Sequence, residues 1–93
     1  MPAAAASGSH RSRELFARNL RAARRRAGLS QERLSELARL HRTEISLLER
    51  GERDPKLSTI MRLADALGVQ AATLVARDDR DLRRSARVEA GDA

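Results

Sequence analysis

The sequence has no cysteine, tryptophan or tyrosine, and its single aromatic residue is Phe16. Without cysteine, the chain can form neither disulfide bonds nor a cysteine-based metal site. The only histidines, His10 and His41, have no helical partner at metal-binding spacing, so we expect no metal and no cofactor. No apolar run approaches the roughly 18 residues of a membrane span. These absences predict a soluble cytoplasmic protein, not bound to a membrane, with a thin aliphatic core.

Charge is distributed unevenly along the chain. Lys and Arg total 19 against 13 Asp and Glu, a net charge of +6. Residues 1–10 carry no charge and residues 77–93 carry five basic and five acidic groups, so the whole excess lies in residues 11–76. Within residues 11–28, seven arginines accompany a single acidic residue. A basic face on a small domain indicates a polyanionic partner such as nucleic acid, although a basic amphipathic helix can also lie on a membrane surface.

The chain divides into three parts. Residues 1–10 are small and polar, and we expect them to be a flexible, disordered arm. Residues 11–76 have apolar residues at helical spacing and form one domain, because 93 residues with 41% hydrophobic content cannot build a second core. Residues 77–93 are a charged tail with two large apolar residues, which we expect to be partly helical or disordered.

The apolar pattern predicts an all-α domain, since no segment alternates at period two for long enough to be a strand. Ser12 and Ser30 can cap helix starts, and Gly28 and Gly68 can take left-handed turns at helix ends. The five expected helices cover about residues 11–27, 30–38, 41–50, 57–67 and 69–76. Their expected core residues are Phe16, Leu20, Ala23, Ala27, Leu34, Leu37, Ala38, Ile45, Leu48, Ile60, Leu63, Ala64, Leu67, Leu74 and Val75.

The second and third expected helices are short and separated by a brief turn. This spacing is typical of a helix-turn-helix, in which the first helix crosses the DNA backbone and the turn delivers the second into the major groove. Stepping about 100° per residue from Ile45 puts Leu48 on the buried side and Thr43 on the outside. The outward face is mostly uncharged and can form hydrogen bonds, whereas an ordinary solvated face usually carries more Glu and Lys. This face therefore favours contact with base edges.

Three blocks of the sequence resemble one family at that family's own spacing: LSQERLSELA at residues 29–38, ISLLERGE at 45–52 and LADALGV at 63–69, with Pro55 between the last two. They are similar to the Xre or Cro/repressor-type helix-turn-helix proteins. The resemblance implies a compact, lambda-repressor-like domain of five helices. It also implies sequence-specific binding to double-stranded DNA, as a homodimer on an inverted-repeat operator, and regulation of transcription.

The resemblance also assigns roles to single positions. Gln31 resembles the family glutamine that hydrogen-bonds a phosphate and braces a neighbouring side chain, although a simple helix-start residue is the alternative. Leu47 matches a base-facing position, where it could touch a thymine methyl, pack on a partner protomer or be a scattered surface leucine. Together with the arginines that we expect at phosphates, the predicted DNA-contacting residues are Gln31, Arg42, Thr43, Ser46, Leu47, Arg50, Arg53, Arg11 and Arg13.

Two positions depart from the family pattern, and two others fit it. Where the family commonly has glycine, this chain has Arg39, which must accept an unfavourable backbone unless the turn differs. His41 stands where the family has Ser or Asp, and we expect it to be a cap or a partly buried packing residue. Arg24 and Glu49 match a structural ion pair between the first and third helices. The helical wheel supports this pair independently, because Glu49 lies at the edge of the buried arc.

The leading functional interpretation is a bacterial DNA-binding repressor or controller-type autoregulator associated with the nucleoid. An antitoxin that also grips a toxin, and a protein-interaction adaptor on the same fold, are the alternatives. We expect no enzyme, because neither histidine has a plausible acid–base partner and the chain has no glycine-rich phosphate loop. Dimerisation is expected through the last two helices, with Val69, Leu74 and Val75.

Overall fold

The computed structural model describes residues 2–77, which fold as five α-helices without a β-strand. The helices are α1 (Pro2–Arg26), α2 (Gln31–Ala38), α3 (Arg42–Glu49), α4 (Leu57–Leu67) and α5 (Ala71–Val75). The predicted all-α class with five helices is confirmed. Within residues 2–77, no helix is both long enough and apolar enough to cross a membrane. The predicted charged tail, residues 77–93, lies outside the described residues except for Arg77.

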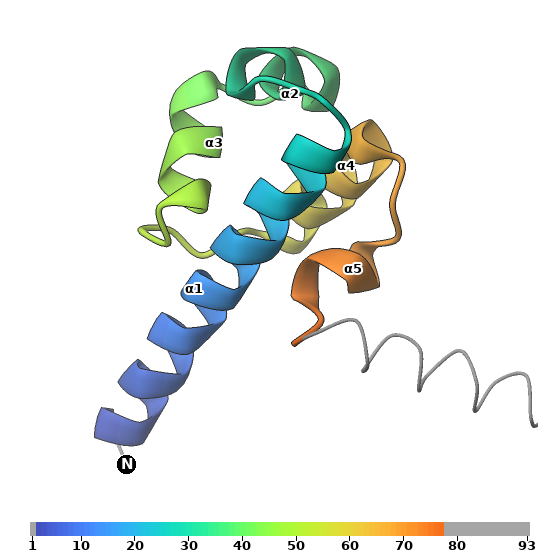
Figure 1. The fold of residues 1–93 in the computed structure, drawn as a ribbon. Coiled ribbons are helices and arrows are strands. Elements are labelled where there is room, and N and C mark those ends of the chain that lie inside the picture. Colours follow the sequence, from blue (N-terminus) through green and yellow to red (C-terminus); the bar gives the residue numbers. More distant parts are fainter. Residues whose placement is uncertain (1, 78–93) are drawn as a thin grey trace, which may run out of the picture.

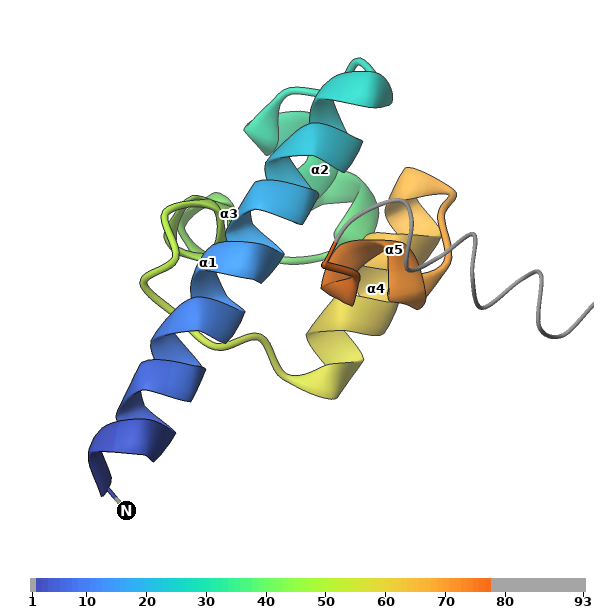
Figure 2. The same cartoon turned by 60° about the horizontal axis from the view of Figure 1, so that its bottom comes forward.

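The first helix starts earlier than the sequence analysis predicts. Its N-terminal turns extend beyond the other helices in both views (Figures 1 and 2). Residues 2–10 are therefore helical here, where a disordered arm is predicted. Pro2 suits a first helical position because its missing N–H would have no partner there, and the alanines of residues 3–6 are the strongest helix formers. Ser12 lies inside the helix, so the prediction that it caps the start is wrong.

The core is aliphatic, and every helix contributes to it. Phe16 is also buried, at 3% exposure. Six side chains have no exposed surface: Leu20 from α1, Leu34 from α2, Ile45 and Leu48 from α3, Leu63 from α4 and Leu74 from α5. Because all five helices converge on one set of side chains, the position of α3 depends on the whole domain and not on the two-helix motif alone.

Three predicted core residues lie outside the core: Ala27, Leu37 and Val75, of which Val75 is 50% exposed. Ala27 is exposed, at the end of α1 where the chain turns away at Gly28. Leu37 is 45% exposed, because α2 buries Leu34, Ser35 and Ala38 instead. Burial of Ser35 is possible since its hydroxyl donates a hydrogen bond to the Glu32 carbonyl oxygen at 2.6 Å. The buried face of α2 is thus rotated away from Leu37.

The helices pack in a defined order around this core. α1 contacts α3 on one side and α5 on the other, while α2 contacts α3 and α4, and α4 contacts α5 (Figure 1). Asn19, in the middle of α1, donates hydrogen bonds to the carbonyl oxygens of Leu74 and Ala76 at 3.1 and 2.7 Å. The sequence analysis overlooked Asn19, because the carbonyls that it binds are 55 and 57 residues away in the chain.

Candidate functional site

The turn between α2 and α3 determines how α3 is presented. The predicted cap at Ser30 is confirmed, because its hydroxyl oxygen accepts a hydrogen bond from the Arg33 amide at 3.0 Å. After α2, Arg39 adopts a left-handed conformation with φ of 59°, the only positive φ of a non-glycine residue among those described. The chain therefore keeps the family turn and accepts an unfavourable backbone at Arg39. His41 is the N-cap residue of α3 and is exposed, with no capping hydrogen bond from its side chain.

α3 has a buried face and an outward face, as the helical wheel predicts. Ile45 and Leu48 are fully buried. On the opposite face, Arg42 and Thr43 are exposed, together with Arg50 just beyond the helix end, and Ser46 and Leu47 are half-buried. Leu47 is therefore less exposed than its outward position on the wheel suggests. The outward face offers a hydroxyl pair, two guanidinium groups and one apolar side chain.

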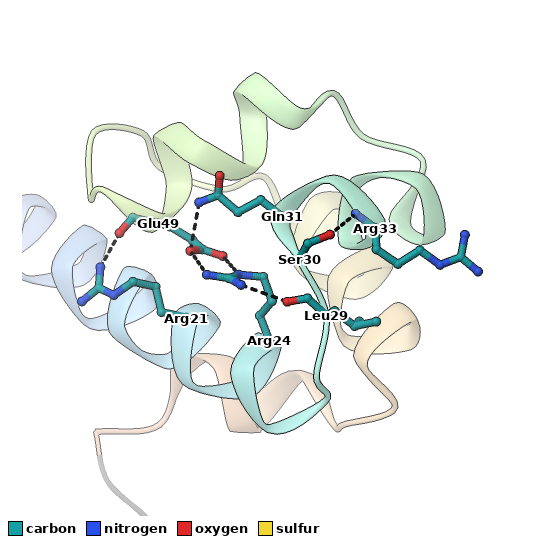
Figure 3. A network of polar contacts seen from close by, with 7 residues as sticks. All are labelled: Arg21, Arg24, Leu29, Ser30, Gln31, Arg33 and Glu49. Carbon is teal, nitrogen blue, oxygen red and sulfur yellow. Dashed lines mark hydrogen bonds and ion pairs between the residues drawn. The ribbon is translucent and has the colours of Figure 1, made fainter.

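A buried polar network holds the C-terminal end of α3 against α1 (Figure 3). The Glu49 carboxylate accepts hydrogen bonds from Arg24 Nε at 2.6 Å and from Arg24 Nη2 at 3.0 Å. The Glu49 side chain is 3% exposed and that of Arg24 is 14% exposed. The hydrogen bond to Glu49 and its negative charge raise the pKa of Arg24 above its ordinary value, against the opposing effect of burial. The structure thus brings Arg24 and Glu49 together as a paired, buried unit.

Two further arginine contacts complete this attachment. Arg24 Nη1 donates to the Leu29 carbonyl oxygen at 2.9 Å, which ties the turn before α2 to the same guanidinium. Arg21, one helical turn before Arg24, donates to the Glu49 carbonyl oxygen at the end of α3. A cation at a helix C-terminus also favours the helix dipole. The sequence analysis overlooked Arg21, although its spacing of three residues from Arg24 puts both on one flank of α1.

Gln31 joins the same network from the first position of α2. Its side-chain Nε2 donates a hydrogen bond to Glu49 Oε1 at 3.2 Å, and the residue is half-buried. An amide nitrogen carries two hydrogens, so one N–H and the carbonyl oxygen have no role in this contact. Gln31 is therefore oriented by Glu49 and keeps a donor for another group.

Three of the arginines predicted to contact DNA are ion-paired. Arg13 Nε lies 3.0 Å from Asp54 Oδ1, and Arg50 Nε lies 2.6 Å from Glu52 Oε2. Arg53 pairs with Glu44. Arg50, at the end of the outward face of α3, therefore already has an acidic partner within the chain. The acidic residues that follow α3 in the loop supply two of these partners.

Arg11 and Arg42 differ from these three arginines. Both are exposed, and neither forms an ion pair within the described part of the chain.

A second difference from the sequence analysis concerns His10, whose Nε2 lies 3.1 Å from Glu14 Oε1, so one histidine does have an acidic neighbour. That pair is solvent-exposed on one face of α1. Among residues 2–77, no three His, Asp or Glu side chains come together as metal ligands could.

Comparison with known proteins adds family relationships to this geometry. Residues 20–74 match the family model described as helix-turn-helix. The chain is 45% identical over 65 residues to control protein C.SmaI of Serratia marcescens, covering 70% of this chain and 77% of that protein. It is 42% identical over 64 residues to control protein C.BamHI of Bacillus amyloliquefaciens, covering 68% and 79%. The crystal structure of the restriction-modification controller protein C.AhdI of Aeromonas hydrophila is similar with a TM-score of 0.65 and 39% identity, covering 67% of this chain and 94% of that one.

Proposed function

The chain belongs to the Xre-type helix-turn-helix family of DNA-binding transcription regulators, and we propose that it is a controller protein that binds an inverted-repeat operator as a homodimer. The outward face of α3 carries this proposal. Exposed Arg42 and Thr43 lie at the start of the helix, and half-buried Ser46 follows one turn later. Arg and Ser or Thr side chains are suited to the hydrogen-bonding groups of base edges in the major groove.

The contacts on the buried side of α3 support the proposal that its outward face recognises bases. Base recognition needs a helix whose orientation does not change from one encounter to the next. Burial of Ile45 and Leu48 and the Glu49 network fix α3 to α1 and α2. Gln31, oriented by Glu49, directs its remaining amide hydrogen to a backbone phosphate beside the groove. Leu47 touches a thymine methyl, the one apolar group that bases present there.

Phosphate contacts supply most of the affinity. About four to six contacts per protomer would give log K against log salt a slope near −4 to −5, from the release of about 0.9 counterion per contact. Arg11 and Arg42 are the exposed, unpaired members of the predicted set within residues 2–77. At Arg13, Arg50 and Arg53, a phosphate must compete with the carboxylate that each arginine already pairs with.

A two-fold dimer is proposed because one short helix reads too few base pairs for useful specificity. α4 and α5 carry exposed apolar side chains that a partner can cover: Leu57 at 74%, Met61 at 49% and Val75 at 50% exposure. Leu74 has no exposed surface, so its predicted place in the interface is wrong. Val69 is half-buried and Val75 is exposed, so both remain in the proposed interface, and Leu57 and Met61 join them. The two recognition helices would then meet half-sites with centres about 34 Å apart.

The names of the relatives favour a controller over an antitoxin. C.SmaI and C.BamHI are control proteins, and C.AhdI is a restriction-modification controller. We therefore place the operator of this protein upstream of its own gene and of a restriction-modification gene pair. A protein that acts there works in the cytoplasm, on the nucleoid. It needs no cofactor or catalytic group for that role.

Footprinting on the DNA upstream of the gene tests this function. The expected result is protection of two inverted half-sites about one helical turn apart, with Arg42→Ala and Thr43→Ala each removing the protection. Analytical ultracentrifugation of Leu57→Glu together with Met61→Glu should show monomers, with the Arg62→Gln protein as a dimeric control. A single asymmetric footprint contradicts the dimer. Binding with no sequence preference and a flat salt dependence contradicts the regulator and favours the adaptor.

A further inference from the structure

An open groove of about 980 Å³ runs along the outer side of α1, between the end of α3 and the chain that follows α5. The acidic residue that lines it is Glu14, which is paired with His10. Five arginines line the groove: Arg11, Arg18, Arg21, Arg50 and Arg77. Arg18, Arg21 and Arg77 were not among the residues predicted to bind DNA.

Two of these guanidinium groups are held by backbone carbonyl oxygens instead of carboxylates. Arg18 Nη2 donates to the Arg77 carbonyl oxygen at 2.9 Å, and Arg21 donates to the Glu49 carbonyl oxygen. A carbonyl oxygen positions a guanidinium but carries no net charge, so the positive charge remains available to an anion. Among the residues that the structure describes, neither Arg18 nor Arg77 forms an ion pair.

The contrast with the loop after α3 is informative. There, Arg13 and Arg53 each lie against a carboxylate, which offsets their positive charge and competes with a phosphate for their N–H donors. In the groove, Arg11, Arg18 and Arg77 have no carboxylate partner among residues 2–77, so no such competition arises within the described part of the chain. A phosphate that binds these arginines does not have to compete with a carboxylate. A guanidinium can bind a phosphate through two parallel hydrogen bonds. The groove is therefore better prepared for phosphate than the loop.

We propose that this arginine groove binds backbone phosphates of DNA, so that contact with the duplex continues from the end of α3 along α1. The inference rests on the proposed function and extends it. Arg50 links the two surfaces, because it lies at the end of the outward face of α3 and also lines the groove, although its Nε is paired with Glu52 at 2.6 Å. Arg11 and Arg21 are separated by about 15 Å along α1. A DNA strand carries one charge per about 3.4 Å of helix axis, so the groove can meet more than one phosphate.

Salt-dependent binding to a duplex of unrelated sequence tests the groove without requiring the operator. Arg18→Gln removes the charge and keeps an amide that can donate to the Arg77 carbonyl. Arg77→Gln removes a charge and leaves that carbonyl in place. Arg62→Gln, on the exposed surface of α4 and outside the groove, is the matched control. Thermal unfolding followed by circular dichroism checks that each variant folds.

Each groove variant should reduce the magnitude of the slope of log K against log salt by about 0.9 per protomer, and weaken binding about fivefold to tenfold near 0.1 M salt. Arg62→Gln should change the slope little. Groove variants that match Arg62→Gln overturn the inference, and the proposed function still stands if the parent protects its operator. The groove would then be left to an acidic protein partner. A parent protein with no salt-dependent DNA binding overturns both proposals. If Arg18→Gln fails to fold, Arg77→Gln decides the result.

Discussion

Removing one partner of the Arg24–Glu49 pair should destabilise the domain much more than replacing both. The Glu49 carboxylate accepts three hydrogen bonds, from Arg24 Nε, Arg24 Nη2 and Gln31 Nε2, and is 3% exposed. Arg24→Met would leave this carboxylate buried with Gln31 as its remaining partner, at a cost of about 3–5 kcal/mol. Glu49→Leu would leave the Arg24 guanidinium, which is 14% exposed and still bound to the Leu29 carbonyl. We expect about 2–4 kcal/mol there.

The double variant Arg24→Met/Glu49→Leu should lose about 1 kcal/mol or less, because two apolar side chains of similar volume replace two charges that no longer need desolvation. The coupling energy of the cycle is then at least about 4 kcal/mol. Urea unfolding followed by circular dichroism measures all four proteins, and each kcal/mol corresponds to about 4–8 °C in Tm for a domain of this size. Equal, small losses in the three variants would refute the reasoning, since they would mean that water already solvates the pair.

The same pair has a defined pH behaviour. Hydrogen bonding to Glu49 raises the pKa of Arg24. A cation whose pKa is raised by folding contributes stability that is fully present below its ordinary pKa and is lost only as the pH rises through the raised value. Both values lie above the working range, so the contribution of Arg24 should be the same at about pH 7 and about pH 10. Measuring the Arg24/Glu49 double-mutant cycle by urea unfolding at about pH 7 and at about pH 10 checks this.

Three further predictions concern single positions. Arg39→Gly should stabilise the domain by about 1 kcal/mol, because Arg39 is exposed and has a φ of 59°, which glycine adopts without strain; a loss of stability in urea unfolding would show that the arginine side chain compensates for its backbone. Ser30→Ala should cost about 1 kcal/mol by removing the 3.0 Å bond from the Arg33 amide, whereas Ser58→Ala, an exposed position in the first turn of α4, should change the unfolding midpoint little. Replacing a single thymine with uracil at one position in each operator half-site should weaken binding by about 0.8 kcal/mol, and Leu47→Ala should lose that sensitivity; if the alanine protein responds as the parent does, Leu47 does not read the methyl.

Much of the fold was predictable because its signals are local. The capping hydroxyl of Ser30 and the left-handed turn at Gly68 depend on residues within four positions of each other, so the pattern is sufficient. The N-terminal extension of α1, residues 2–10, was not predicted, because two local signals in that segment conflict. Residues 3–6 are four alanines, whose helix propensity favours what the structure has, while the small polar composition of residues 1–10 suggested an arm.

The candidate site was only partly predictable. Some partners of its charged residues could be predicted from the sequence, and others could not. The pairing of Arg24 with Glu49 could be predicted from the family resemblance, with support from the helical wheel. The partners of Arg13 and Arg53 could not, since Asp54 and Glu44 reach them only through the path of the loop after α3. The groove on α1 was also hidden, because Arg77 reaches Arg18 from 59 residues away.

The sequence by itself determined that residues 11–76 form five helices, which face of α3 is apolar and how large the excess of arginine is, because periodicity, capping and charge count are properties of neighbouring residues. Only the tertiary structure decided which arginines are free to meet a phosphate. The charge of a guanidinium is available or neutralised according to whether a carboxylate or a carbonyl oxygen lies within about 3 Å. That depends on how α1, the loop after α3 and the end of α5 pack together.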